Sequence, residues 1–416
     1  MPALNKSHPS VLLVSARWWA LSARLAISFL RNHLRVQALC PEHHPLTFVS
    51  GIETLHHYSG RDSLADLYRA MAASDADIVV PCDDGAVAHL HALHRQEPAV
   101  RALIERSLGS PQGYAIVESR YELLRLAIEL GIRVPTTERI GAADALSPWH
   151  ERADAKAVLK VDGSCGGFGV RIAGSLDQAD AARRELAKRP SAATAWKRQF
   201  IDRDPLAVWS QGNARPADIT VQQFVAGRPA NLMAACWQGR VLATLSVAVV
   251  ASDGETGAAT IVRPIDNPQM VQAAERLAAR LQISGFCGLD FMLDSGTGAP
   301  YLIEMNPRST QLGHLCVSDR GSLADVLCAE LSGASRGACS KPIRAPTIAF
   351  FPQKKPKTAA GATPLAAIAH AHQDIPLEHP ALIRELMLPP WPERQWAARL
   401  YHALKPIEYA PPVYYE

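Results

Sequence analysis

The first third of the chain alternates short apolar runs with segments whose apolar residues recur at helical spacing. The runs SVLLVSA, RVQALCP and DIVVPCDD have the length of strands, and they occupy residues 10–16, 35–41 and 77–84. Helical spacing is found in LSARLAISFLRNHL and SLADLYRAMAASDA, which are residues 21–34 and 63–76. Strands that alternate with helices predict a parallel sheet. We therefore expect an N-terminal α/β domain over residues 1–113.

Two acidic residues, Asp83 and Asp84, follow the third of these strands. Ligands bind at the carboxyl ends of strands in open α/β sheets, so both residues are candidates for a ligand site. They are equally expected as N-caps of the next helix. No GxGxxG motif follows the first strand, which argues against a dinucleotide site there.

The middle of the chain predicts a longer series of elements. SRYELLRLAIELGIRVP (119–135) reads as a helix with Ser119 as N-cap, Glu122 completing a capping box and Gly131 as C-cap. Two more helices are predicted at 268–283 and 322–333, and two strands at 219–227 and 240–252. Residues 189–216 are polar and irregular, which predicts a linker inside a lobe. Proline becomes dense from residue 341 onward, which predicts an appended C-terminal segment.

The stretch GFCGLDFMLDSGTGAPYLIEMNPRST (285–310) predicts a hairpin with carboxylates in it. Its strands are CGLDFML and YLIEMNP, and DSGTGAP is the turn. Because side chains alternate between faces, Asp290 lies on the face opposite Leu289 and Phe291. If the hairpin is symmetric about Thr297, Asp290 lies directly opposite Glu304. The alternation also places Asn306 and Leu302 on the face of Glu304.

Two carboxylates placed in this way predict a cation between them. Directly opposite residues have Cβ atoms about 4.5–5.5 Å apart, so Asp290 and Glu304 repel each other unless a cation intervenes. Hard oxygen ligands with the carbonyl of Asn306 beside them suit Mg²⁺, which usually also binds substrate phosphates. The alternative is that both carboxylates form the solvent face of a surface hairpin.

A glycine-rich loop occurs in VLKVDGSCGGFGVRI (158–172), where four glycines fall within seven residues. Such a loop can turn backbone N–H groups toward an anion. It does not have the form GxxxxGK[ST] leading into a helix, so it is not a Walker A loop. Two β-rich runs flank it, which predicts a hairpin tip that folds over phosphates. Lys160 shares a strand face with Val158 and Asp162 and could reach the same anion. A merely flexible loop is the alternative.

Composition excludes several classes of partner. The 416 residues are 48% hydrophobic, and 43 Lys+Arg against 40 Asp+Glu give a net charge of +3. This balance predicts no nucleic-acid partner. The longest apolar run, VLATLSVAVVA (241–251), is too short to span a bilayer, which predicts no membrane partner. The 8 cysteines include no CxxC motif, which predicts reduced thiols and a cytoplasmic protein.

The order of these motifs resembles that of the ATP-grasp enzymes, a superfamily that includes biotin carboxylase, carbamoyl phosphate synthetase and D-alanine–D-alanine ligase. The resemblance covers residues 114–335, and DF…YLIEMNPR is its most specific part. It implies an α/β and α+β fold, in which a parallel α/β lobe precedes a two-lobed ATP-grasp fold. The lid lobe would span about 140–220 and the C-lobe about 221–335, with a C-terminal extension at 336–416.

The resemblance also implies the binding residues. Asp290, Glu304 and Asn306 would hold Mg²⁺, with Mn²⁺ as an alternative metal, and Arg308 would contact the transferred phosphate or the acyl phosphate. ATP would contact the cations Arg120 and Lys160, the loop residues Gly163, Ser164, Gly166, Gly167 and Gly169, and the hinge residues Gln222, Gln223, Phe224 and Val225. The family often has Lys at the position of Arg120 and Glu in the hinge, so these contacts differ in this chain. Independently of the resemblance, Arg263 is a candidate to pair with a substrate carboxylate, with a structural salt bridge as the alternative.

The implied activity is a ligation that consumes ATP. A small-molecule carboxylate would be activated as an acyl phosphate and coupled to an amine, with release of ADP and phosphate. A homodimer is a common state in the family. Two alternatives stay open: carboxyphosphate or carbamoyl phosphate chemistry with bicarbonate, and a nucleotide-binding protein without catalysis.

Overall fold

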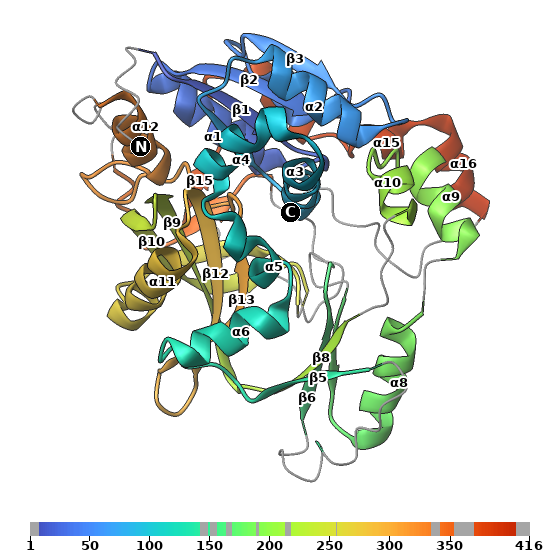
Figure 1. Cartoon of the computed structure of the whole chain (residues 1–416), viewed down its shortest axis with the longest axis vertical. Coiled ribbons are helices and arrows are strands. Elements are labelled where there is room, and N and C mark those ends of the chain that lie inside the picture. The colour runs from blue at the N-terminus through green and yellow to red at the C-terminus, as the bar shows by residue number, and fades with distance from the viewer. Residues whose placement is uncertain are drawn as a thin grey trace.

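The computed structural model of the chain describes residues 8–141, 149, 156–163, 169–188, 191–212, 218–254, 256–333, 342–352 and 370–404. These residues form three sheets. In Figure 1 the N-terminal sheet lies at the top, a large sheet lies in the centre, and a small sheet lies below it. The expected combination of a parallel α/β lobe with a two-lobed α+β unit is confirmed.

The N-terminal sheet is parallel and has the strand order β3-β2-β1-β4. Its central strand β1 is buried on both faces, because Val11 and Leu13 face one core while Leu12 and Val14 face another. This is the burial typical of a parallel sheet covered by helices. The elements are β1 (Ser10–Val14), α1 (Ala20–Arg31), β2 (Arg35–Cys40), η1 (Pro45–Phe48), β3 (Thr54–His57), α2 (Ser63–Ala73), β4 (Ile78–Pro81), α3 (Asp84–Gln96), η2 (Pro98–Val100), α4 (Arg101–Leu108), η3 (Pro111–Gly113) and α5 (Tyr114–Val117).

Helix α6 (Arg120–Glu129) leads from this lobe to the lid. Ser119 caps it as predicted, by accepting from the backbone N–H of Glu122, and Gly131 follows its end with φ +68°. The carboxylate of Glu122 does not close a capping box. It pairs with Arg125 and Arg139 instead, at 3.0 and 3.1 Å.

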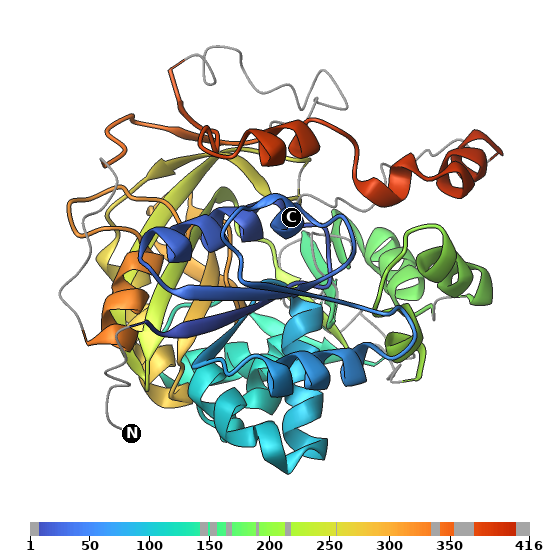
Figure 2. The same ribbon diagram turned by 90° about the horizontal axis from the view of Figure 1, so that it is seen from above.

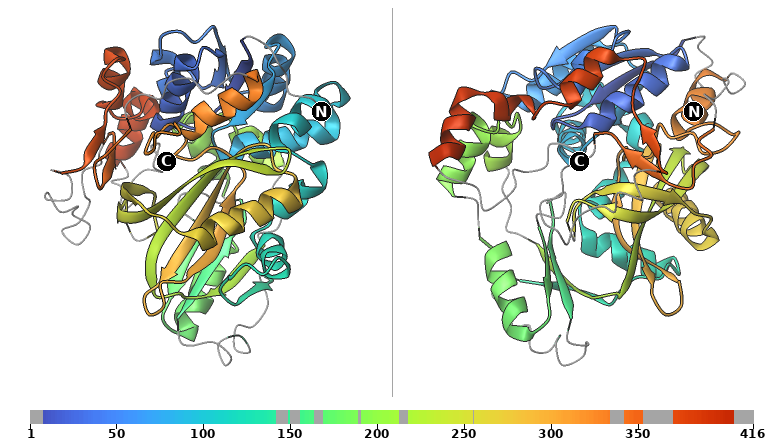
Figure 3. Two further views of the ribbon diagram at one scale, coloured as in Figure 1. Left: turned by 90° about the vertical axis from the view of Figure 1, so that its left-hand side faces the viewer. Right: turned by 180° about the vertical axis from the view of Figure 1, so that it is seen from behind.

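The lid has an antiparallel sheet of order β5-β8-β6-β7, with α8 packed against it. Figure 3 shows this sheet set apart from the rest of the molecule. Its own small core includes Leu159, Val221 and Ala179. The elements are β5 (Thr137–Ile140), β6 (Ala157–Val161), β7 (Val170–Ala173), α8 (Leu176–Leu186), α9 (Ala192–Phe200), α10 (Ala207–Gly212) and β8 (Ile219–Gln223).

The large sheet has seven strands in the order β13-β12-β9-β10-β11-β14-β15. One face packs on α6 and α11, and the other packs on α1 and α12, so the N-terminal lobe shares a core with it. The elements are β9 (Gly227–Trp237), β10 (Arg240–Ser252), β11 (Ala259–Pro264), α11 (Pro268–Leu281), β12 (Gly285–Asp294), β13 (Pro300–Asn306), α12 (Leu323–Ser332), β14 (Ile348–Phe350), β15 (His372–Asp374), α14 (Pro380–Leu386), α15 (Trp391–Arg394) and α16 (Trp396–Leu404).

Several expectations need correction. The described part of 189–216 forms helices α9 and α10 and is not a linker, because its apolar residues Trp196 and Phe200 recur at helical spacing. The C-terminal segment is not merely appended, since β14 and β15 extend the large sheet. It then crosses the N-terminal lobe, where the Trp391 ring stacks on His43 at 4.8 Å between ring centroids. Figure 2 shows it continuing to α9 and α10.

Two further findings concern the chemistry of the whole chain. Five described cysteines are free and buried, whereas Cys316 is disulfide-bonded. The prediction of reduced thiols is therefore wrong for Cys316. Within the described ranges, every helix is too short or too polar to cross a bilayer.

Candidate functional site

Asp290 and Glu304 face each other across the β12–β13 hairpin, as the sequence predicts. The pairing is Asp290 with Glu304 and Gly288 with Asn306. The prediction for Leu302 is wrong, because the register shifts by one residue at this point and Leu302 pairs with Phe291. Leu302 and Phe291 then belong to one core. The extra residue of this β-bulge is Ile303, and it turns Glu304 away from the core.

The carboxylate of Asp290 is held by two amides. Asn306 donates from Nδ2 to Oδ2 at 3.0 Å, and Asn231 of β9 donates from Nδ2 to Oδ1 at 2.5 Å. Burial and the neighbouring charge of Glu304 raise the pKa of Asp290 to about 6. Sequence reasoning missed Asn231, because it did not identify β9. Asn231 is the amide directly opposite Asp290 on that strand.

Lys160 extends from the lid sheet to this hairpin. It is buried on β6, and its Nζ donates to the carbonyl of Ile303 at 3.2 Å. The bulge therefore supplies the oxygen that receives the lysine. Burial lowers the pKa of Lys160 to about 8, although the charge of Glu304 opposes this shift.

Arg120 is the first residue of α6, and it joins the lid to the hairpin. Its Nη2 lies 2.7 Å from Oε1 of Glu304. On the lid side its guanidinium donates to the carbonyl of Val161 and lies 3.6 Å from Oδ1 of Asp162. Both cations predicted to contact phosphates therefore converge on the carboxylate hairpin.

Arg308 follows the hairpin and binds the N-terminal lobe. Its guanidinium donates two hydrogen bonds to the carboxylate of Asp84, from Nε to Oδ1 at 2.8 Å and from Nη2 to Oδ2 at 3.0 Å. Its guanidinium also lies over the Trp19 ring, 5.1 Å from the centroid. Asp83 is the N-cap of α3, so of the two acids only Asp84 reaches the hairpin. The signal for Asp84 was its position at a strand's carboxyl end, but its partner could not be read from the sequence.

The glycine loop can be placed only at its ends. Val161 and Gly169 share a backbone hydrogen bond, and β6 pairs with β7, so the predicted hairpin strands are confirmed. Gly163 is exposed with φ +75°. Ser164, Gly166 and Gly167 lie outside the described residues.

The hinge lies between β8 and β9. The side chain of Gln222 is buried and donates to Thr137. The backbone N–H groups of Gln223 and Phe224 already donate to Thr136 and Lys156, respectively. Within the described chain, Val225 takes part in no backbone–backbone hydrogen bond.

Arg263 is not brought together with the other candidates. In the large sheet, Arg263 of β11 lies opposite Ala248 of β10. Ala248 lies opposite Ala230 of β9, and Ala230 lies opposite Phe291 of β12, so these four side chains share one face. Phe291 is next to Asp290 on β12, so the two side chains point to opposite faces of the sheet. Arg263 therefore lies on the face away from the carboxylates.

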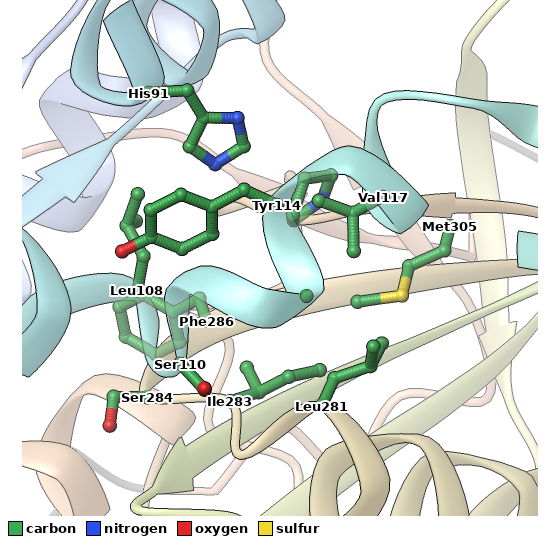
Figure 4. A pocket seen from close by; sticks show the side chains of 12 residues that line it. His91, Leu108, Ser110, Tyr114, Val117, Leu281, Ile283, Ser284, Phe286 and Met305 are labelled. Atoms are coloured by element: carbon green, nitrogen blue, oxygen red, sulfur yellow. The ribbon is translucent and has the colours of Figure 1, made fainter. Parts of the chain in front are cut away.

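A small cavity lies elsewhere, between the N-terminal lobe and the core side of the hairpin. Figure 4 shows the His91 ring stacked on Tyr114 above Met305 and Leu281. The ring centroids of His91 and Tyr114 are 4.2 Å apart. Apolar side chains make up most of its wall, and none of the candidate site residues lines it.

The oxygen ligands of the hairpin suit a hard cation. Two opposed carboxylates and the Asn306 amide match the oxygen preference of Mg²⁺. The described residues contain no group of three or more His, Cys, Asp or Glu side chains arranged for a metal. A cation at the hairpin would therefore take its remaining ligands from substrate or water.

Comparison with known proteins gives a consistent result. Residues 118–311 match the ATP-grasp domain family. A carboxyaminoimidazole ribonucleotide synthase from Aspergillus clavatus, solved with ATP, has a TM-score of 0.59 at 16% identity over 82% of each chain. An L-amino acid ligase from Bacillus licheniformis has a TM-score of 0.52 at 14% identity, covering 78% of this chain and 75% of its own.

The biotin carboxylase domain of a 2-oxoglutarate carboxylase from Hydrogenobacter thermophilus has a TM-score of 0.53 at 12% identity. That match covers 80% of this chain and 71% of the other. No curated protein matches the sequence. At these identities the likeness to solved structures shows the fold.

Proposed function

We propose that the chain is an ATP-dependent ligase, because residues 118–311 match the ATP-grasp domain family. It activates the carboxylate of a small molecule as an acyl phosphate, couples it to an amine and releases ADP and phosphate. The observation that carries the proposal is the pairing of Asp290 with Glu304 across the hairpin, where Lys160 and Arg120 also converge.

The proposed metal ligands are Asp290, Glu304 and Asn306, with Mg²⁺ as the metal and Mn²⁺ as an alternative. When bound, the metal would supply positive charge to the phosphates of ATP and lower the cost of charge build-up during transfer. In the protein itself, the amides of Asn231 and Asn306 hold the carboxylate of Asp290 in place, one at each oxygen. The fit is one of ligand chemistry, since both carboxylates and the amide offer oxygen atoms.

The cations have separate proposed roles. Lys160 and Arg120 contact the phosphates of ATP, together with the loop residues Gly163, Ser164, Gly166, Gly167 and Gly169. Lys160 belongs to strand β6 of the lid, so closure of the lid would carry it along, whereas Arg120 begins helix α6, which packs on the large sheet. The hinge segment Gln222, Gln223, Phe224 and Val225 contacts the adenine, with the backbone of Val225 as the hydrogen-bonding group. Arg308 contacts the transferred phosphoryl group.

The reaction needs little covalent chemistry from the protein. A carboxylate oxygen of the acid bonds to the γ-phosphorus, and the bond from that phosphorus to ADP breaks. The amine nitrogen then bonds to the acyl carbon, the carbon–oxygen bond breaks, and phosphate leaves while the nitrogen gives up its proton. Positioning and charge neutralisation carry both steps, which agrees with a site made of cations and carboxylates.

The similar structures bear on the choice of acid. The L-amino acid ligase favours amino acids as substrates of this chain, and the biotin carboxylase domain, solved with bicarbonate, favours bicarbonate as a second candidate acid. That same domain is a dimer, which supports a test of the oligomeric state by light scattering.

The experiment is a screen for ADP release with Mg²⁺ across amino acids, other small acids and bicarbonate, supplied singly and in pairs. Hydroxylamine is added in a parallel screen, because it traps an acyl phosphate as a hydroxamate. We expect ADP and phosphate in equal amounts, and a hydroxamate with the correct acid. AMP as the main nucleotide product, or no acid-dependent turnover with any of these compounds, would overturn the proposal.

A further inference from the structure

The bidentate ion pair of Arg308 and Asp84, called the fork below, joins two lobes. Asp84 is the first residue of α3, directly beyond the carboxyl end of β4, and Arg308 follows the carboxylate strand β13. The two residues are 224 positions apart, yet two hydrogen bonds of 2.8 and 3.0 Å join them. A bidentate pair of this kind is stronger and more specific in geometry than a hydrogen bond between neutral groups.

The donors of Arg308 are already in use in this arrangement. Besides the two bonds to Asp84, Nη2 donates to Oδ1 of Asn306 and Nη1 donates to the carbonyl of Ser309, each at 3.2 Å. One flat side of the guanidinium lies on Trp19. An anion that is to accept these two hydrogen bonds from Arg308 must therefore displace Asp84.

The two partners differ in their access to solvent. The side chain of Arg308 is 9% exposed, whereas that of Asp84 is 40% exposed. A cation that approaches from solvent thus meets Asp84 first. Once Arg308 turns to an anion, Asp84 needs a new positive partner, because an unpaired and partly buried carboxylate is costly.

We propose that Asp84 binds the ammonium group of the amine substrate, and that this exchange of partners releases the guanidinium of Arg308 to the phosphoryl group. The inference rests on the proposed function and adds the substrate class to it. The amine partner is one that is protonated in neutral solution, such as an amino acid or another aliphatic amine. The proposal concerns how the ammonium is bound before it gives up its proton.

The surrounding charges agree with an ionised Asp84. Burial alone would raise its pKa, but the attraction of Arg308, and then that of Arg17 and Arg120, lowers it overall. Asp84 is therefore a carboxylate at neutral pH and competent to bind a cation. Arg120 is itself paired with Glu304, and by the proposed function it turns to the phosphates of ATP.

A purely structural role for the pair makes a different prediction. If the fork only fastened the two lobes together, its loss would impair every reaction of the protein to the same degree. A role in binding the ammonium impairs only reactions with a charged amine. Hydroxylamine separates the two cases, because it is mostly neutral near pH 7.

The test compares Asp84→Asn with the parent protein and with Asp62→Asn, a matched change at the exposed cap of helix α2. The acid is the one that gives the most hydroxamate in the screen above. The nucleophile is either hydroxylamine or a mixture of amino acids. We expect kcat/KM for the amino acids to fall about 10- to 100-fold in Asp84→Asn, the scale of one charged hydrogen bond. Hydroxamate formation should not fall, because hydroxylamine needs no anionic partner and Arg308 no longer pairs with Asp84.

Each outcome decides one question. Equal losses with both nucleophiles in Asp84→Asn, while Asp62→Asn behaves as the parent does, would overturn the role in ammonium binding. A conservative Asp84→Glu variant keeps the carboxylate, so it should recover amine-dependent turnover if binding is the role. Thermal unfolding shows whether each variant is folded. If the parent protein gives no hydroxamate with any acid, the proposed function fails instead.

Discussion

The guanidinium of Arg120 donates to the carboxylate of Glu304, with Nη2 2.7 Å from Oε1. Glu304 is also a proposed metal ligand, so Arg120 and a metal ion compete for it. Arg120 is held on its other side by Val161 and Asp162 of the lid. Loading of the site should therefore transfer Arg120 from Glu304 to the phosphates of ATP.

Arg120→Met should accordingly have opposite effects on the two ligands. Without nucleotide, the variant should bind Mn²⁺ about tenfold more tightly, because Glu304 no longer has a cationic partner, and it should bind ATP about tenfold more weakly. Isothermal titration calorimetry measures both affinities. Arg125→Met is the matched control, since Arg125 lies on the same helix but pairs with surface carboxylates. Weaker Mn²⁺ binding by Arg120→Met would contradict the competition.

Loss of a metal ligand should slow turnover strongly. Glu304→Gln and Asn306→Ala should each lower kcat by about 100-fold or more, the scale seen when a preorganised charge stabiliser is removed. Glu185→Gln is the control, because Glu185 pairs with Arg171 on the lid surface. The measurement is ADP release at saturating Mg²⁺ with the acid and amine from the screen. Near-normal rates in both variants would remove the metal assignment.

Asp290 should make stability depend on pH in an unusual direction. Its pKa is raised to about 6, so between about pH 4 and 6 the folded protein holds a proton that the unfolded chain has lost. Stability attributable to Asp290 therefore falls as pH rises through this window. Asp290→Asn removes this cost. The free energy of unfolding of the variant minus that of the parent should therefore increase by roughly 1–3 kcal/mol between pH 4 and pH 7.

Urea unfolding in EDTA at several pH values measures this difference. EDTA removes divalent cations that would otherwise stabilise the ionised carboxylate of the parent. A difference between variant and parent that stays constant from pH 4 to pH 7 would show that Asp290 is not perturbed in the way its surroundings indicate.

Asp374 of β15 joins the C-terminal segment to helix α1 of the N-terminal lobe and to the segment that follows β13. Its buried carboxylate accepts from Arg24 of α1 and from Nε2 of His314, the latter at 2.8 Å. Although burial acts to raise its pKa, the charges of His314 and Arg24 lower it well below its usual range. Its contribution to stability is therefore present at neutral pH and lost as the pH falls through the acid range.

Asp374→Asn should lower the free energy of unfolding by about 3 kcal/mol at pH 7, because it leaves the largely buried guanidinium of Arg24 without its anionic partner. Glu378 lies on the same segment and pairs with Arg31, but its side chain is 68% exposed, whereas that of Asp374 is 2% exposed. Glu378→Gln should therefore lower the free energy of unfolding by less than about 1 kcal/mol. Chemical denaturation measures both. Equal losses in the two variants would contradict the role of burial.

The sequence alone determined the elements whose signals are local. Caps and helical spacing predicted α6, α11 and α12, and the alternation of apolar residues in 285–310 predicted that Asp290 faces Glu304. Hairpin register depends on a short turn and two adjoining strands, so it can be read locally. The bulge at Ile303 could not be read in this way, because one extra residue leaves the apolar composition of the strand unchanged.

The tertiary structure decided which distant residues meet. Arg120 and Glu304 are 184 positions apart, and Asp84 and Arg308 are 224 apart. Their pairing depends on how the lobes pack against one another, which no local pattern encodes. The same holds for Asn231, whose position opposite Asp290 follows from the pairing of β9 with β12. Arg263 shows the converse, since its guanidinium was a candidate to pair with a substrate carboxylate but the sheet turns its side chain to the opposite face. Local alternation specifies which side chains share a face, whereas only the packing of sheets and lobes specifies what that face meets.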